Sequence, residues 1–130
     1  IEKAGQSENF RLLGQVQDIA SVFKVSDFFV LPSRAEGFGI VLVESLASGC
    51  ITIVSNLEGI FDSIITHEQD GFIIKNYDGK EYAKTILKLI DLPDKLDQVR
   101  KAGFDRVNKK YSKENLISGF KTLLGKPKRS

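Results

Sequence analysis

A chain of 130 residues, 42% of them hydrophobic, is long enough to bury a core and suits a single domain over residues 1–130. It has no apolar run near the roughly 18 residues that cross a bilayer and no secretory signal pattern. Its one cysteine, Cys50, excludes an internal disulfide and favours a reducing compartment, so we expect a cytoplasmic protein. Methionine is absent and the chain opens with Ile1, so we expect a piece of a longer protein.

The net charge of +2 conceals an uneven distribution along the chain. Residues 1–74 hold four Lys and Arg against ten Asp and Glu, whereas residues 75–130 hold fifteen against seven. The basic half is consistent with solvated helix faces, and it also suits an anionic surface at the inner face of a membrane. Nucleic acid is not among the expected partners.

The first predicted elements alternate between helices and short strands. Residues 1–5 are predicted to end a helix, and residues 10–13 to form a strand. A helix over Asp18–Val25 follows, with Asp18 as its N-cap, and then a strand over 28–31. The strand over 28–31 is apolar without alternation, which is typical of a parallel strand covered on both faces.

The apolar stretch from residue 40 to Gly49 admits a strand or a helix, because Ile40, Val41 and Val43 are β-branched. Its length and the closing Gly49 favour the helix. The later predicted elements are strands over 51–54 and 72–74, a short helix over 60–65, helices starting at Asp78 and Pro93, and a terminal helix with a basic tail over 112–130. This order indicates an α/β fold, a Rossmann-like parallel sheet with helices on both faces and a helical C-terminal end.

Ligands of such sheets bind beyond the carboxyl ends of the strands. Three loops are expected there, over residues 14–16, 32–39 and 55–59. In the second loop, Gly37 and Gly39 flank an aromatic residue and let a ligand approach the backbone. The helix that follows presents free N–H groups and a positive dipole end, a combination that suits a diphosphate.

Two carboxylates accompany this loop. Glu36 precedes the glycines and could hold sugar hydroxyls, and Glu44 lies about one turn into the helix, where it could accept two ribose hydroxyls. The pattern alone leaves an alternative equally open, in which Glu44, Ser45 and Ser48 share a polar face toward water and Glu36 belongs to an ordinary surface turn.

Several other chemistries lack their motifs. No Gly-x-Gly-x-x-Gly follows a strand and no Gly-Lys-Ser/Thr occurs, which argues against a nicotinamide dehydrogenase and a P-loop. His67 is the only histidine and Cys50 the only cysteine, so we expect no metal site. We expect His67 to be a solvated loop residue and Cys50 a small core residue. Ser33 has no neighbouring histidine to activate it, and no residue is assigned as catalytic.

The chain resembles, in one register over roughly residues 10–111, the C-terminal half of the retaining glycosyltransferases of family 4 (glycosyl transferases group 1), which have the GT-B fold. The matching segments are FRLLGQV from Phe10, DFFVLPS from Asp27, EGFG from Glu36, ESLASG from Glu44, residues 55–59, DSII from Asp62 and DGFII from Asp70.

The resemblance implies a role for each part of the site. The contacts to donor sugar and diphosphate would be Glu36, Gly37, Phe38, Gly39 and Ile40. Glu44 would bind the ribose, and Gln15 and Val16 would border the base. Such enzymes use a nucleotide sugar as substrate and usually no metal, so we expect no metal or other cofactor. Their catalysis rests on positioning and on stabilising the leaving group.

The chain departs from the family pattern at two positions. Ile51 stands where the family usually has Pro, and Arg34 is unusual before Glu36, where it could touch phosphate or be a plain loop charge. The family also carries two upstream βα units, with an Arg and a Lys for the diphosphate, and an acceptor-binding N-terminal domain. We expect these parts to be missing from this piece.

The sequence therefore predicts the donor-binding part of a retaining hexosyltransferase, inactive by itself. The donor would be a UDP-, GDP- or ADP-hexose, and the acceptor a glycan or glycolipid bound by the missing N-terminal domain. Two alternatives remain open: a nucleotide-sugar epimerase of the same architecture, and a non-catalytic nucleotide-binding regulatory domain.

Overall fold

A computed structural model describes residue 5 and residues 7–124 of the chain. Residues 1–4 of the predicted helix end and residues 125–130 of the basic tail lie outside the described residues. The helical elements are η2 (Ser7–Asn9), α1 (Ile19–Lys24), α2 (Ile40–Ala47), α3 (Phe61–Ile64), α4 (Gly79–Ile90), α5 (Pro93–Lys110) and α6 (Lys113–Leu124). The strands are β1 (Phe28–Leu31), β2 (Ile51–Ser55) and β3 (Phe72–Ile74).

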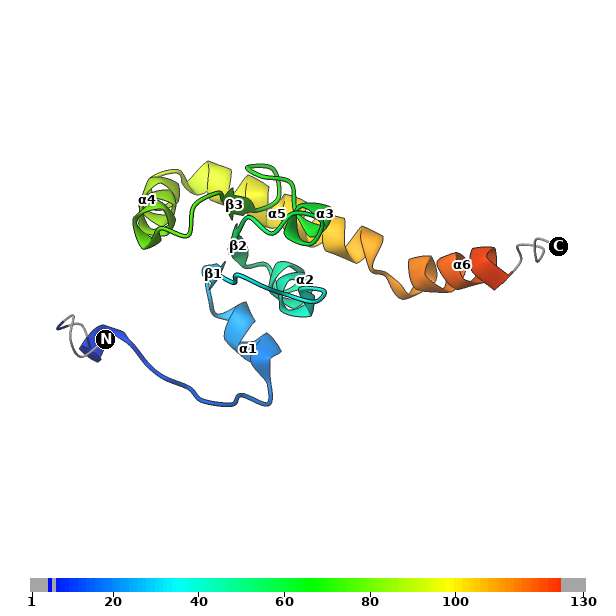
Figure 1. The fold of residues 1–130 in the computed structure, drawn as a ribbon, viewed down its shortest axis with the longest axis horizontal. Helices are drawn as coiled ribbons and strands as arrows, with labels where there is room; N and C mark the ends of the chain where they lie inside the picture. The colour runs from blue at the N-terminus through cyan, green and yellow to red at the C-terminus, as the bar shows by residue number, and fades with distance from the viewer. Residues whose placement is uncertain (1–4, 6, 125–130) are drawn as a thin grey trace.

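The three strands form one parallel sheet in the order β1-β2-β3 (Figure 1). Phe28 of β1 lies opposite Ile51 of β2, and Ile53 of β2 lies opposite Phe72 of β3. Every residue of β2 is buried, because the central strand is paired on both sides and covered on both faces. The strands predicted over 28–31, 51–54 and 72–74 are therefore confirmed.

Helices cover both faces of the sheet. Ile51 and Ile53 pack on one face with α4 and the first half of α5, which contribute Leu89 and Val99 to the cluster. Val54 points to the other face and packs with buried side chains of α2, α3 and the second half of α5. The predicted α/β class, with helices on both faces and a helical C-terminal end, is confirmed.

Helix α5 crosses the sheet at the edge where the strands begin. Its Arg100 guanidinium lies 3.6 Å from the carboxylate of Asp27, just before β1. Gly103 touches two other elements: a Cβ there would lie 2.8 Å from Leu46 Cδ2 and 2.9 Å from the carbonyl oxygen of Asp70, just before β3. Helix α5 thus closes the amino edge of the sheet and leaves the carboxyl edge open.

A buried ion pair fastens α5 to the turn before β3. The Asp70 side chain is 7% exposed and accepts a hydrogen bond from Arg106 Nη1 at 2.8 Å. Its other oxygen accepts the backbone N–H of Thr66 at 2.6 Å. Because both carboxylate oxygens have donors, this charge can stay buried.

The predicted strand over residues 10–13 is wrong. These residues form an extended segment without sheet pairing, and Leu12 is 87% exposed. β1 pairs with β2 along one edge, and no strand among the described residues runs along its other edge. A single strand-like segment cannot satisfy its backbone hydrogen bonds alone. Figure 1 shows this segment running away from the sheet before it turns into α1.

The helices predicted from residue 18 onward agree with the structure, and Asp18 is the N-cap that was predicted for α1. Asp18 accepts a hydrogen bond from the backbone N–H of Ser21, which lowers the pKa of the Asp18 carboxyl together with the bond from the Ser21 hydroxyl. Ser112 accepts the N–H of Asn115 at the start of α6, which extends away from the rest of the molecule (Figure 1). No described helix has both the length and the apolar character needed to span a bilayer.

Candidate functional site

Three loops lie at the open carboxyl edge of the sheet. They connect β1 to α2 over residues 32–39, β2 to α3 over 56–60, and β3 to α4 over 75–78. The first two were predicted. Residues 14–16 do not follow a strand, and the loop over 75–78 was missed, although it follows a predicted strand.

Glu36 is held at this edge by a short chain of hydrogen bonds. The hydroxyl of Ser33 donates to Glu36 Oε1 at 3.1 Å, and the hydroxyl of Ser55, at the end of β2, donates to the carbonyl oxygen of Ser33. Glu36 is half-buried. The carboxylate is therefore oriented by the ends of two strands, and the positioning role of both serines was missed from the sequence.

Gly39 is required at its position for two reasons. It is the N-cap of α2 with φ 72° and ψ 37°, a left-handed conformation that favours glycine. A Cβ there would also lie 3.3 Å from both Phe61 Cε1 and Ile64 Cδ1. Gly37, by contrast, has open space where a Cβ would stand.

The N-terminus of α2 is open to a ligand. Within the part of the chain that the structure describes, no side chain caps it, so the N–H groups of its first turn are available to an external acceptor. The two large apolar residues beside it, Phe38 and Ile40, are 62% and 63% exposed. An anion placed here would meet backbone N–H groups and the positive end of the helix dipole.

Glu44 lies one turn after Ile40 on the same face of α2. Its side chain is exposed, and no described residue holds it by a hydrogen bond or ion pair. A ligand bound along the first turn of α2 can therefore engage this carboxylate without breaking an existing contact.

The alternative that Ser45 shares a water-facing side of α2 with Glu44 is wrong. Ser45 is fully buried. Its hydroxyl donates to the carbonyl oxygen of Leu42 at 2.9 Å and lies 3.0 Å from Thr52 Oγ1 in β2. Ser45 therefore fastens α2 to the sheet, and Glu44 projects from a different side of the helix.

Arg34 links two of the loops. Its guanidinium carbon lies 5.5 Å from the centre of the Tyr77 ring, in the loop after β3, which is the geometry of a cation–π contact. Neither the contact nor Tyr77 was predicted, because the pair is 43 positions apart in the chain and follows strands that are not adjacent.

A buried phenol lies behind this edge. The Tyr82 hydroxyl of α4 is buried and has no hydrogen-bond partner among the described residues. Burial raises the pKa of Tyr82, an effect that the nearby Ser55 hydroxyl partly offsets. Tyr82 is therefore a neutral phenol behind the loop that carries Glu36.

Gln15 and Val16 are not brought into this arrangement by a strand. Gln15 is exposed and Val16 is half-buried, in the segment before α1. Their predicted role beside the base stays a prediction.

His67 and Cys50 have structural contacts. His67 Nδ1 accepts the backbone N–H of Ile73 at 3.0 Å. The Cys50 thiol donates to the carbonyl oxygen of Phe23 at 3.0 Å, and burial raises its pKa. Across the described residues, no group of three or more His, Cys, Asp or Glu side chains could hold a metal ion.

The sheet and the helices on its two faces define a Rossmann-like α/β domain. The crystal structure of Anabaena Alr3699/HepE in complex with UDP has the same fold, with a TM-score of 0.89 and 21% identity over 95% of this chain and 34% of that chain. A second match is the C-terminal domain of a glycosyl transferase group 1 family protein (LpcC) from Francisella tularensis. Its TM-score is 0.71 at 24% identity, over 85% of this chain and 59% of that one.

Sequence comparison identifies the family. Residues 1–106 match the model of the glycosyl transferases group 1, and the chain belongs to this family. It is 33% identical over 123 residues to the capsular polysaccharide biosynthesis glycosyltransferase CapM of Staphylococcus aureus. The match covers 92% of this chain and 32% of CapM, so the chain spans about a third of that relative's length. The resemblance to part of a GT-B glycosyltransferase is confirmed.

Proposed function

We propose that this chain is the donor-binding part of a retaining glycosyltransferase that transfers a hexosyl unit from a nucleotide-diphosphate sugar to a glycan or glycolipid. One observation carries the proposal. The N-terminus of α2 opens at the carboxyl edge of the sheet, between an oriented Glu36 and a Glu44 that no described residue pairs, and no described side chain caps it. Anabaena HepE, which shares the fold, has been crystallised with UDP and with UDP-glucose, which supports a nucleotide sugar as ligand.

In this proposal each group contacts one part of the donor. Glu36 accepts hydrogen bonds from hexose hydroxyls, and Glu44 from the ribose. N–H groups from Gly37 to Ile40 contact the diphosphate, while Gln15 and Val16 border the base. When the bond between the anomeric carbon and the diphosphate oxygen breaks, negative charge grows on the leaving diphosphate. The end of α2 stabilises this charge without a metal.

Family membership favours a transferase over an epimerase or a non-catalytic nucleotide-binding domain. The name of CapM supports an acceptor in capsule or envelope polysaccharide synthesis, which would place the enzyme in the cytoplasm, at the inner face of the membrane. We expect the chain alone to bind donor weakly and to transfer no sugar, because the acceptor would be held by another part of the protein.

A donor screen tests the proposal. Saturation-transfer NMR would compare UDP-glucose, GDP-mannose and ADP-glucose, each added to the 130-residue chain. We expect saturation of ribose and hexose protons for one of the three. The absence of saturation for all three would overturn the proposal.

A further inference from the structure

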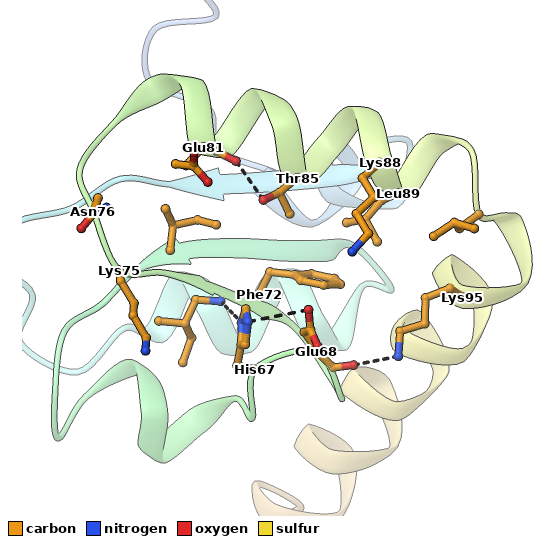
Figure 2. A pocket seen from close by; sticks show the side chains of 13 residues that line it. His67, Glu68, Phe72, Lys75, Asn76, Glu81, Thr85, Lys88, Leu89 and Lys95 are labelled. Atoms are coloured by element: carbon orange, nitrogen blue, oxygen red, sulfur yellow. Dashed lines mark hydrogen bonds and ion pairs between the residues drawn. The ribbon is translucent and has the colours of Figure 1, made fainter.

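A groove of about 590 Å³ runs along the free edge of β3, between this strand, α4 and the segment around His67 and Glu68 (Figure 2). None of the residues assigned to the donor lines it. Its volume lies within the range of about 300–1,000 Å³ that is usual for small-molecule sites.

The wall of the groove is apolar and belongs to the core. Phe72 and Ile74 of β3 and Leu89 of α4 are 5%, 8% and 3% exposed, so their positions are set by packing. Leu92, after the end of α4, is 43% exposed and widens the apolar surface. An alkyl chain or other apolar group therefore finds a preformed surface.

Two lysines lie at one end of this surface. Lys88 of α4 is exposed, and no described residue forms a hydrogen bond or ion pair with it. Lys95 of α5 donates to the carbonyl oxygen of Glu68 at 3.0 Å, which fixes its position and leaves two N–H donors for another acceptor. Figure 2 shows both side chains reaching into the space between α4 and Glu68.

The acidic residues of the groove do not cancel this charge. The carboxylate of Glu68 lies 3.9 Å from His67 Nε2. Glu81 lies in the first turn of α4, toward the other end of the groove (Figure 2). At the end formed by Lys88 and Lys95, two ammonium groups face the single carboxylate of Glu68, so this end keeps a net positive charge.

We propose that this groove binds an amphiphilic anion. Its apolar chain lies against Phe72, Leu89 and Leu92, and its phosphate or carboxylate head accepts hydrogen bonds from Lys88 and Lys95. Soluble amphiphiles and anionic lipids share this chemistry. The groove is separate from the donor loops, so a failure of this proposal would not affect the proposed transferase function, and the reverse also holds.

The test is a titration of the ¹⁵N-labelled chain with octyl phosphate, butyl phosphate and inorganic phosphate, followed by NMR. We expect saturable shifts at the amides of Thr85, Lys88 and Leu89, and at least tenfold tighter binding of the octyl than of the butyl ester, because added methylenes are buried. Inorganic phosphate should shift none of these amides. Equal affinity for all three anions, or no saturation with octyl phosphate, overturns the proposal.

Two matched variants locate the head group. Lys88→Gln should weaken octyl phosphate binding about three- to fivefold, the effect of one partly exposed ion pair. Lys84→Gln, one turn earlier on α4 and outside the groove, should leave it unchanged. Equal weakening by both variants would mean nonspecific attraction to a basic surface and would contradict the site.

Vesicles then identify the source of the ligand. If the parent and Lys84→Gln sediment with phosphatidylglycerol vesicles and Lys88→Gln does not, the ligand of the groove is a lipid. Octyl phosphate binding without sedimentation assigns it to a soluble amphiphile. Sedimentation that both variants keep at full strength contradicts a lipid-binding groove.

Discussion

Replacement of Gly39 by alanine tests how the loop before α2 is built. The left-handed conformation costs an L-residue about 1–2 kcal/mol. The new Cβ would stand 3.3 Å from Phe61 and Ile64, which are 0% and 2% exposed and cannot move freely, and such overpacking costs about 1–3 kcal/mol. Alanine also lowers the conformational entropy of the unfolded chain, which stabilises the folded state by about 0.4–1 kcal/mol and partly offsets these costs. We therefore expect Gly39→Ala to lower the free energy of unfolding by about 2–3 kcal/mol.

Urea unfolding followed by circular dichroism measures this loss, and thermal unfolding should show a midpoint about 8–12 °C lower. Gly37→Ala is the matched control two positions earlier, because no atom lies within 4 Å of its Cβ position. It should change stability by less than about 1 kcal/mol. Equal losses in the two variants, or no loss at Gly39, would refute the reasoning about both the conformation and the contact.

Two further predictions concern buried groups away from the loop. Asp70→Asn should lower the free energy of unfolding by about 1–3 kcal/mol, because it weakens the hydrogen bonds to Arg106 and to the Thr66 N–H. The control Asp105→Asn, at an exposed position, should change the free energy of unfolding little. Equal losses for the two variants in urea unfolding would contradict this role of Asp70. Folding raises the pKa of the Cys50 thiol, so its contribution to stability is complete below the ordinary value of 9.0 and is lost as the pH rises through the folded value. The difference in free energy of unfolding between the parent and Cys50→Ala should therefore narrow above pH 9.0; a constant or widening difference rules this out.

The sheet could be predicted from sequence because its strands are nearly all apolar and are separated by helices, as in Phe28–Leu31 and Ile51–Ser55. The prediction of a strand at residues 10–13 failed because these residues have no neighbouring strand among the described residues. An apolar segment becomes a strand only beside another strand, and local pattern does not reveal whether a partner is present. Strands could thus be predicted from sequence where an apolar segment is buried inside the sheet.

The sequence predicted the backbone of the candidate site but not the side-chain contacts that hold its loops in place. Gly39 and the start of α2 follow from a strand, a glycine loop and a helix in local order. The bond from Ser55 to the Ser33 carbonyl and the contact of Arg34 with Tyr77 join segments 22 and 43 positions apart. Such contacts depend on how the strands are ordered in the sheet, which no short motif contains.

The role of Glu44 offers the most direct test of the donor site. An NMR titration of the nucleotide sugar that the donor screen selects, into the ¹⁵N-labelled chain, Glu44→Gln and the exposed control Glu114→Gln, gives three dissociation constants. A carboxylate that accepts ribose hydroxyls contributes about 1.5–3 kcal/mol, so Glu44→Gln should bind about tenfold or more weakly. Glu114→Gln should bind like the parent, with shifts centred on residues 36–44. Equal affinity of Glu44→Gln and the parent, or shifts confined to other elements, would contradict a nucleotide-sugar site at the start of α2.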